Sequence, residues 1–414
     1  MAQATGIGQL FMLATFPLLT RAYDPISFGL FALVTAFVGI VSVGVCLCLD
    51  LAIVQGRTAD AADELCAAAL YSVPITTTLS AIGLTVLTHF NLLGYGKLPL
   101  WCIPISAAMI GLNGVYVACR YRMLREQRFR IVARVTLLQS GGRAVAPLAW
   151  SLVAPGWLGL SLGELTGRLL GVGGLLVSLL PQLTQNSAWA SGRRWWIIVL
   201  REKQYTAALL SSVLVDSVAS QSIAPLLAAA YGAKAAGEYF LVATLLMAPA
   251  VLLGTAAADV IHPRAARLLI DAPEQLPKFL NKASALLLLA GLGIYVPTYF
   301  LAPILLPIIF DKHWTLIVQI TQAMTPFAVV AFVASPCSRM LIALRQTRWK
   351  ITSDMVRLFG TPITVCLAVM WGKPFADGIW MLTWFLTGAY CFYFAVTYHA
   401  TRRISQIPPK NSNA

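Results

Sequence analysis

Twelve long apolar runs follow one another along this chain of 414 residues, separated by short segments that carry charges, Pro or Gly. They fall at about residues 3–20, 26–49, 65–88, 100–119, 135–153, 158–181, 205–230, 239–258, 283–308, 316–344, 351–370 and 375–400. A membrane-spanning α-helix needs roughly 20 consecutive apolar residues. Runs this long and this uniformly apolar satisfy their backbone inside a bilayer only as helices, because barrel strands are shorter and alternate in polarity. The pattern therefore predicts an all-α membrane protein of about 12 spans.

Composition excludes a soluble protein of two or three domains. Hydrophobic residues make up 58% of the chain and charged residues 11%, and the mean hydropathy is +0.77. A soluble chain needs a more polar surface to remain dissolved. The net charge of +14 would suggest a nucleic-acid partner in a soluble domain. Here the basic residues lie between the apolar runs, so we expect the lipid bilayer and no nucleic acid as partner.

Charge asymmetry predicts the orientation. With the N-terminus placed inside, 21 Lys and Arg residues fall in cytoplasmic segments and 5 fall on the opposite side. The 5 are Arg21, Lys97, Lys234, Lys312 and Lys373. Cytoplasmic loops are enriched in Lys and Arg, so both termini are expected to be cytoplasmic. Residues 1–8 contain no Lys or Arg, which favours a first span over a signal peptide, although that span is short enough to suggest missing upstream residues.

The eight cysteines indicate neither a disulfide framework nor a metal site. All lie in or at the ends of apolar runs, without a CxxC pair or a His–Cys cluster. They are Cys46, Cys48, Cys66, Cys102, Cys119, Cys337, Cys366 and Cys391. We interpret them as small hydrophobic side chains and expect no metal and no cofactor.

An internal repeat relates the two halves of the chain. A shift of 208 residues places Pro17 on Pro225, Tyr23 on Tyr231 and Gly29 on Gly237, and 8 of the 18 positions from 17 to 34 are identical. The shift spans an even number of helices, so the halves share one orientation, as in transporter folds with parallel repeats. We predict two six-helix lobes, residues 1–204 and 205–414, with a substrate site between them.

Several short motifs resemble those of polysaccharide and O-antigen flippases, which belong to the multidrug, oligosaccharidyl-lipid and polysaccharide exporter (MOP) superfamily. The first is Arg21-Ala22-Tyr23-Asp24-Pro25 followed by Phe28-Gly29-Leu30-Phe31. Others are Leu51-Ala52-Ile53-Val54, Arg128-Phe129 leading to Gln139-Ser140, Tyr231-Gly232 with Gly237-Glu238-Tyr239, and Phe310-Asp311 with Trp314. In the last motif Asp311 stands where the family has Gly. The resemblance implies the MATE-like fold of this superfamily.

The resemblance also implies a function. Such proteins move an undecaprenyl-pyrophosphate-linked oligosaccharide from the cytoplasmic to the periplasmic leaflet of the bacterial inner membrane by alternating access. They are often coupled to a cation gradient, here H⁺ or Na⁺, and other membrane proteins of polysaccharide assembly are possible partners. A multidrug/cation antiporter of the same fold is the alternative. A polymerase or ligase would need a long periplasmic loop, and no loop exceeds about 25 residues, so we do not expect an enzyme.

Charged residues inside spans are costly and therefore mark candidate sites. Glu164 and Arg168 are one helical turn apart and can pair with each other. Arg143 has no acidic residue within a turn, and Arg339 lies in the cytoplasmic half of the tenth span. An arginine facing a hydrated cavity would suit a pyrophosphate or an acidic sugar, whereas snorkelling to the headgroups is the alternative for Arg339. These four residues form the predicted substrate cavity.

Asp216 is the candidate for ion coupling. It lies midway along the seventh predicted span beside Ser217, Ser220 and Gln221, with no Lys or Arg close in sequence. A lone carboxylate at that depth can exchange a proton or cation, and pairing with an Arg of another span is the alternative. Pro17 and Pro225 occupy equivalent places in the repeat and are candidate hinges, because Pro removes a helical hydrogen bond.

Three further features favour structural roles. Gly159, Gly163, Gly167 and Gly171 form a stripe that predicts close helix packing. Asp354 and Arg357 can pair across one turn. The segment 120–134 carries six arginines, either as a solvated cytoplasmic loop or as a recognition surface for an anionic lipid-linked substrate.

Overall fold

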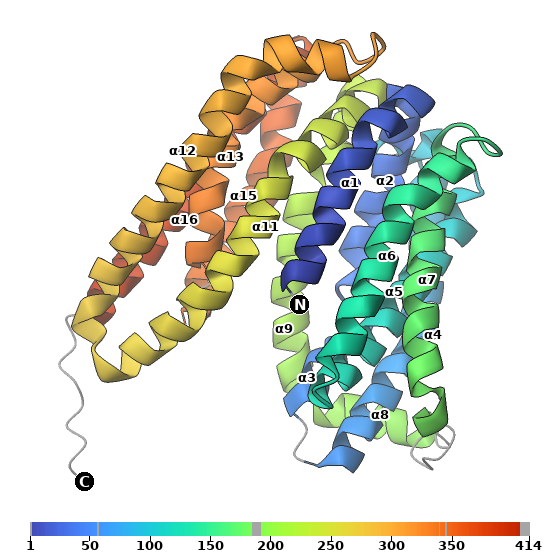
Figure 1. The fold of residues 1–414 in the computed structure, drawn as a ribbon, viewed down its shortest axis with the longest axis vertical. Coiled ribbons are helices and arrows are strands. Elements are labelled where there is room, and N and C mark those ends of the chain that lie inside the picture. The colour runs from blue at the N-terminus through green and yellow to red at the C-terminus, as the bar shows by residue number, and fades with distance from the viewer. Residues whose placement is uncertain (1, 56–57, 184–191, 339, 344–345, 406–414) are drawn as a thin grey trace. The chain divides into compact units, whose positions relative to one another are not determined.

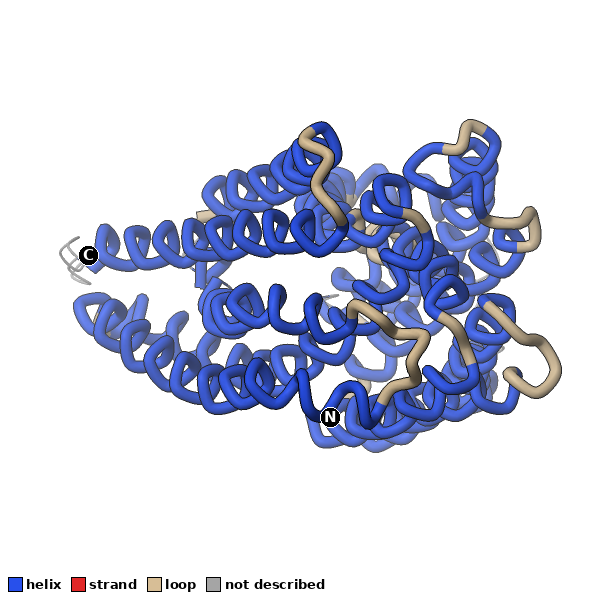
Figure 2. Tube along the Cα trace, turned by 90° about the horizontal axis from the view of Figure 1, so that it is seen from above, coloured by secondary structure: helices blue, strands red, loops and turns tan. Residues whose placement is uncertain are grey.

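A computed structural model describes residues 2–55, 58–183, 192–338, 340–343 and 346–405. Throughout these ranges the regular secondary structure is helical (Figures 1 and 2). The chain divides into two compact units, Met1–Phe240 and Leu241–Ala414, each described here by itself. The predicted all-α fold is confirmed. The lobe boundary at residues 204 and 205 rests on the sequence repeat and stays a prediction.

The first unit is a bundle of long helices joined by short turns. Its elements are α1 (Ala2–Ala22), α2 (Pro25–Ser42), α3 (Leu49–Gln55), α4 (Ala59–His89), the 3₁₀ helix η1 (Leu92–Lys97), α5 (Cys102–Arg125), α6 (Phe129–Trp150), α7 (Trp157–Leu183), α8 (Gly192–Arg201), α9 (Lys203–Gln221), α10 (Ile223–Tyr231) and the first turns of α11 (Ala233–Asp271). In this unit α6 packs along α7 and α1, and α4 packs along α5 (Figure 1).

The second unit continues α11 and adds five further α-helices. These are α12 (Leu276–Ile309), preceded by the 3₁₀ turn η3 (Pro273–Gln275), then α13 (Ile317–Ser338), α14 (Met340–Ala343), α15 (Thr347–Met370) and α16 (Phe375–Ser405). Here α13 packs against both α12 and α16, and α15 packs against α16. Tyr295, which is fully buried, donates a hydrogen bond to the carbonyl oxygen of Leu246 at 3.0 Å.

Each of the twelve predicted runs contains a helix, and ten segments in the described residues are long and apolar enough to cross a membrane. The other two runs correspond to α1 and α6. The apolar described part of α1, Phe11–Ala22, is short. Helix α6 has 22 residues but carries Arg130, Arg134 and Arg143, which lowers its hydropathy without shortening it.

One run that the sequence presents as continuous is broken. Helix α2 ends at Ser42, and the chain turns through Leu47 and Cys48, whose φ angles of 54° and 57° lie in the left-handed region, before α3 begins. Left-handed backbone is rare for residues with a side chain and cannot be read from an apolar run. The seventh run stays helical through Ser222, whose φ and ψ of −70° and −15° are helical and whose N–H and carbonyl groups bond to Val218 and Leu226. Helices α9 and α10 therefore form one span, Leu209–Tyr231, in which Pro225 leaves one carbonyl oxygen of the preceding turn without its N–H partner.

The motif at the first turn has a local structural role. The Asp24 carboxylate accepts a hydrogen bond from the Ser27 backbone N–H at 3.1 Å, and Pro25 occupies the first helical position of α2. The Tyr23 hydroxyl donates to the carbonyl oxygen of Pro147 on α6 at 2.7 Å. Burial raises the pKa of Tyr23 to about 12, so the hydroxyl stays a donor. This motif therefore ends α1, begins α2 and ties both to α6.

The repeat has a direct counterpart inside the first unit. A Cβ atom on Gly29 of α2 would overlap the carbonyl oxygen of Ala233 on α11, and a Cβ atom on Gly237 would overlap that of Pro25. The 208-residue shift pairs Gly29 with Gly237 and Pro25 with Ala233. The two contacts are thus reciprocal, as in a local two-fold arrangement. This reciprocity supports the predicted parallel repeat.

Candidate functional site

An ion cluster of two arginines and one glutamate joins α6 to α7. The Arg143 Nε atom lies 2.6 Å from Glu164 Oε2, and the Arg168 Nε and Nη2 atoms each lie 3.0 Å from Glu164 Oε1. Arg168 Nη1 also donates to the carbonyl oxygen of Met109 on α5 at 3.5 Å. The Glu164 side chain is 6% exposed, that of Arg168 13% and that of Arg143 39%. Two cations share one buried anion, so the cluster carries a net charge of +1.

The glycine stripe of α7 brings this cluster together. Gly163 faces Pro147, Gly167 faces the backbone of Arg143, and Gly171 faces Gln139, each one turn further along α6. A Cβ atom on Gly163 would lie 2.5 Å from Pro147, which is too close for any side chain to fit. The predicted close packing is confirmed. Because the two backbones meet at Gly167, the carboxylate of Glu164 comes within hydrogen-bonding distance of Arg143.

This arrangement corrects the interpretation of Arg143 as an arginine without an acidic neighbour. Its partner is Glu164, 21 residues away in sequence and on the adjacent helix. The predicted pairing of Glu164 with Arg168 is confirmed, but it is only half of the cluster. A guanidinium group held by a carboxylate and still partly exposed is oriented to accept a further anion.

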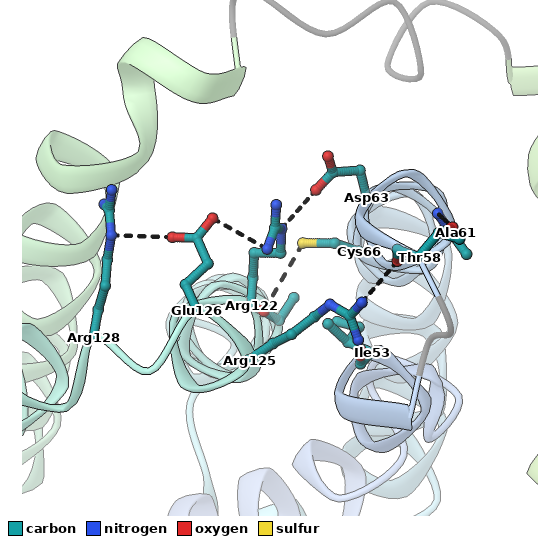
Figure 3. Close-up of polar contacts among 10 residues, drawn as sticks. Ile53, Thr58, Ala61, Asp63, Cys66, Arg122, Arg125, Glu126 and Arg128 are labelled. Carbon is teal, nitrogen blue, oxygen red and sulfur yellow. Dashed lines mark hydrogen bonds and ion pairs between the residues drawn. The ribbon is translucent and has the colours of Figure 1, made fainter.

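Half of the arginines in the segment 120–134 are committed to structural contacts, as Figure 3 shows. The Arg122 Nε atom lies 2.6 Å from Asp63 Oδ1, and Arg122 and Arg128 both pair with Glu126 at 3.1 Å. Arg125 donates to the carbonyl oxygen of Thr58 at 2.8 Å. These contacts tie the C-terminal end of α5 to the start of α4. The predicted loop is in fact mostly helix, since α5 ends at Arg125 and α6 begins at Phe129.

Asp50 is a buried acid that the sequence analysis did not select. It lies in the first turn of α3, just after the left-handed turn, and is 9% exposed. Burial raises the pKa of its carboxyl group, and hydrogen bonds from its own backbone N–H and that of Leu51 offset part of this rise. The sequence signal was weak, because Asp50 stands at the end of an apolar run, where a solvated acid is common.

We predict that Asp50→Asn makes the protein more stable at neutral pH. A raised pKa in the folded state means that stability falls as pH rises from the unfolded pKa, about 4 for Asp, towards the folded pKa, because the unfolded chain ionises first. Asn cannot ionise, so the stability difference between the variant and the native protein should grow over that window. Thermal unfolding in detergent at a series of pH values measures it.

The exposed Asp60, at the start of α4, provides the matched control. Asp60→Asn removes an exposed carboxylate and should not stabilise the protein as Asp50→Asn does. If Asp50→Asn shows the same pH profile as the native protein, burial of its charge has no energetic consequence and the prediction is wrong.

The second unit contains a separate ion cluster on α15. The Asp354 side chain is 1% exposed, and its carboxylate lies 2.7 Å from Lys350 Nζ and 3.4 Å from Arg357 Nη1. The Arg357 guanidinium also lies over the Tyr390 ring of α16, 5.0 Å from its centroid. The predicted pairing of Asp354 with Arg357 is confirmed, and the ring contact links α15 to α16.

Comparison with known proteins identifies the family. A family model described as polysaccharide biosynthesis protein matches residues 18–319. The chain belongs to this polysaccharide biosynthesis protein family. The matched range includes the ion cluster of Arg143, Glu164 and Arg168 and also Asp216. It also includes all but the first residue of the two repeated segments, 17–34 and 225–242. A search of curated proteins finds no significant match.

Solved structures similar to this family member share its fold at low sequence identity. A multidrug resistance MATE family transporter of the MOP superfamily, in an inward-facing conformation, aligns with a TM-score of 0.71 at 13% identity, over 97% of this chain and 99% of that chain. The lipid II flippase MurJ, in an inward closed conformation, aligns with a TM-score of 0.75 at 12% identity, over 97% and 89%. A MOP superfamily transporter from Pyrococcus furiosus aligns with a TM-score of 0.61 at 14% identity, over 98% and 96%. Family and fold together support a transporter or flippase in a membrane rather than an enzyme.

The remaining predicted site residues of this family member are placed as follows. Asp216 is partly buried on α9, where its own carbonyl oxygen accepts a hydrogen bond from the Ser220 hydroxyl. The neighbouring Ser217 donates to the carbonyl oxygen of Gly39 on α2 at 3.3 Å. The role of Asp216 in ion coupling stays a prediction. Arg339 lies outside the described residues, so its part in the cavity also stays a prediction.

Both prolines lie in helical segments. Pro17 lies inside α1, and Pro225 lies in the first turn of α10, which continues from α9. Each Pro removes one helical hydrogen bond and so permits a kink. The hinge roles of both residues stay predictions.

Proposed function

We propose that this protein moves an undecaprenyl-pyrophosphate-linked oligosaccharide repeat unit from the cytoplasmic to the periplasmic leaflet of a bacterial inner membrane. The repeat unit would belong to an O-antigen or another surface polysaccharide, and the movement would follow an alternating-access cycle. Membership of the polysaccharide biosynthesis family and the likeness to a lipid II flippase support this proposal. Other membrane proteins of polysaccharide assembly would supply and receive the substrate.

The ion cluster of Arg143, Glu164 and Arg168 is the observation that carries the proposal. Charged groups inside a membrane are costly, so a cluster with an excess arginine marks a place where an anion is expected. A pyrophosphate matches the planar guanidinium fork of Arg143, which Glu164 holds in place. Arg168 is more buried and anchors the carboxylate to α5 through Met109. Arg143 is thus the proposed contact with the substrate.

A multidrug/cation antiporter is the second candidate, since a MATE family transporter has the same fold. Cationic substrates would call for a cluster with a net negative charge. The net charge of +1 at Arg143, Glu164 and Arg168 favours the anionic lipid-linked substrate instead.

Deletion of the gene in its host tests the function. Surface polysaccharide should disappear, while lipid-linked repeat units accumulate on the cytoplasmic leaflet. If the units still reach the periplasm and only fail to polymerise, the flippase proposal is wrong and a polymerase role gains support.

For coupling, we propose that Asp216 binds H⁺ or Na⁺ in one half of the cycle. Asp216→Asn preserves the shape of the side chain and removes its charge, so transport driven by a cation gradient should fall by at least about tenfold, the effect of roughly 1.4 kcal/mol on a barrier. Uptake into vesicles with and without an imposed gradient measures it. Ser217→Ala, at the adjacent position, is the control and should retain activity. Gradient-driven transport at the native rate in Asp216→Asn would remove Asp216 from the mechanism.

A further inference from the structure

Helix α8 (Gly192–Arg201) has two faces of different kinds. One face docks on the first unit: Trp195 Nε1 donates a hydrogen bond to the Ser72 hydroxyl of α4 at 3.1 Å, and Ile198 is buried. The opposite face carries Trp196, Ile197 and Leu200, whose side chains are 56%, 62% and 44% exposed. These three positions follow the i, i+1, i+4 spacing of a single helix face. The helix is therefore fixed by one side and leaves an apolar surface uncovered on the other.

The depth of α8 follows from its contact with α4. Helix α4 ends at His89, on the side predicted to be periplasmic, and Ser72 lies 17 residues before it. At 1.5 Å per residue this places Ser72 about 26 Å from that end. The hydrocarbon core of a bilayer is about 30 Å thick. Ser72, and with it Trp195, thus lies near the cytoplasmic boundary of the hydrocarbon.

Charge in α8 is concentrated at its two ends. Arg193 and Arg194 stand in its first turn and Arg201 at its last residue, where Arg201 pairs with Glu202 at 3.1 Å. In water, an exposed Trp-Ile-Leu surface costs about 25 cal/mol for each Å² left uncovered. In the interfacial layer, such a surface enters the acyl region while arginines remain among the headgroups.

We propose that α8 is an interfacial anchor that inserts Trp196, Ile197 and Leu200 into the cytoplasmic leaflet, and that the positive charge of Arg193 and Arg194 in its first turn favours a leaflet with anionic phospholipid headgroups. The net basic charge of α8 complements an anionic leaflet. The anchor holds α8, which lies in the chain between the first six predicted spans and the seventh, at a fixed depth. This role is independent of the transported substrate.

Spin labels at three neighbouring positions test the insertion. Ile197→Cys, Ile198→Cys and Arg201→Cys are made in the full chain with its eight cysteines replaced, and reconstituted in vesicles that contain an anionic phospholipid. The label at 197 should be reached by oxygen and severalfold less by a water-soluble nickel chelate. The label at 201 should be reached by the chelate, and the label at 198 by neither. Access of the chelate to 197 would overturn the insertion, and exclusion of both reagents would show that protein covers this face.

The lipid class is tested by exchanging the anionic phospholipid for a zwitterionic one. The label at 197 should then become severalfold more accessible to the chelate, and Arg193→Gln with Arg194→Gln should reproduce that change in anionic vesicles. Equal accessibility in both vesicle types would overturn the assignment to anionic headgroups.

A measurement on the native sequence guards against misfolding of the cysteine-free protein. In vesicles with brominated acyl chains, the quenched fraction of the tryptophan fluorescence should fall in Trp196→Phe relative to the native protein. An unchanged quenched fraction would contradict insertion of Trp196.

Discussion

Gly237→Ala should destabilise the protein by about 3 kcal/mol or more, and Gly29→Ala should do the same. At both positions the new methyl group would overlap a backbone carbonyl oxygen of the neighbouring helix. A flexible side chain can rotate away from such an overlap, but backbone cannot, so α2 and the start of α11 would have to separate. Chemical unfolding in detergent micelles measures the loss. The aromatic contact of Phe31 with Phe240, 5.8 Å between ring centroids, would weaken with it.

Gly83 on α4 is the matched control, because a Cβ atom there would meet no atom within 4 Å. Gly83→Ala should leave stability unchanged or raise it by up to about 1 kcal/mol, through the better helix propensity of Ala. If Gly237→Ala and Gly83→Ala behave alike, the close reciprocal contact of the repeat does not exist in the folded protein.

Glu164→Gln should abolish transport and cost about 3 kcal/mol of stability. The change leaves Arg143 and Arg168 without their shared anion, and removing one partner of a buried ion pair typically costs 3–5 kcal/mol. We place the cost at the low end of this range, because the Arg143 side chain is 39% exposed and solvent screens it. Unfolding and transport are both measured on the purified variant.

Arg143→Gln separates function from stability. The pair of Glu164 with Arg168 remains, so the fold should be retained while transport of the anionic substrate is lost. Arg143→Lys should keep partial activity if charge alone matters, and lose it if a bidentate contact with pyrophosphate matters. Full activity in Arg143→Gln would show that the cluster is only structural.

Sequence reasoning reached the fold because membrane spans depend on properties of single segments. Apolar length and the glycine stripe of α7 are local, and the helices and the packing of α7 on α6 agree with them. The Tyr23-Asp24-Pro25 motif likewise acts within its own turn, apart from the bond to Pro147.

The parts that sequence reasoning missed depend on contacts between segments. Arg143 and Glu164 are 21 residues apart, and only the antiparallel packing of α6 on α7 makes them partners. The break after Ser42 arises because Leu47 and Cys48 adopt left-handed backbone angles, which the apolar sequence does not predict. Asp50 follows that break, so its burial was hidden for the same reason. Hydropathy predicts whether a segment can lie in a membrane, but it does not predict which helices pack against each other.

The most direct test of the central claim is translocation by the purified protein. A fluorescent undecaprenyl-pyrophosphate-linked oligosaccharide is placed in both leaflets of vesicles, and a membrane-impermeant reductant bleaches the outer leaflet. With the native protein, bleaching should proceed to near completion as inner-leaflet substrate crosses, and with Arg143→Gln it should stop at the outer-leaflet fraction. Equal bleaching by the native protein, by Arg143→Gln and by protein-free vesicles would contradict the proposed function.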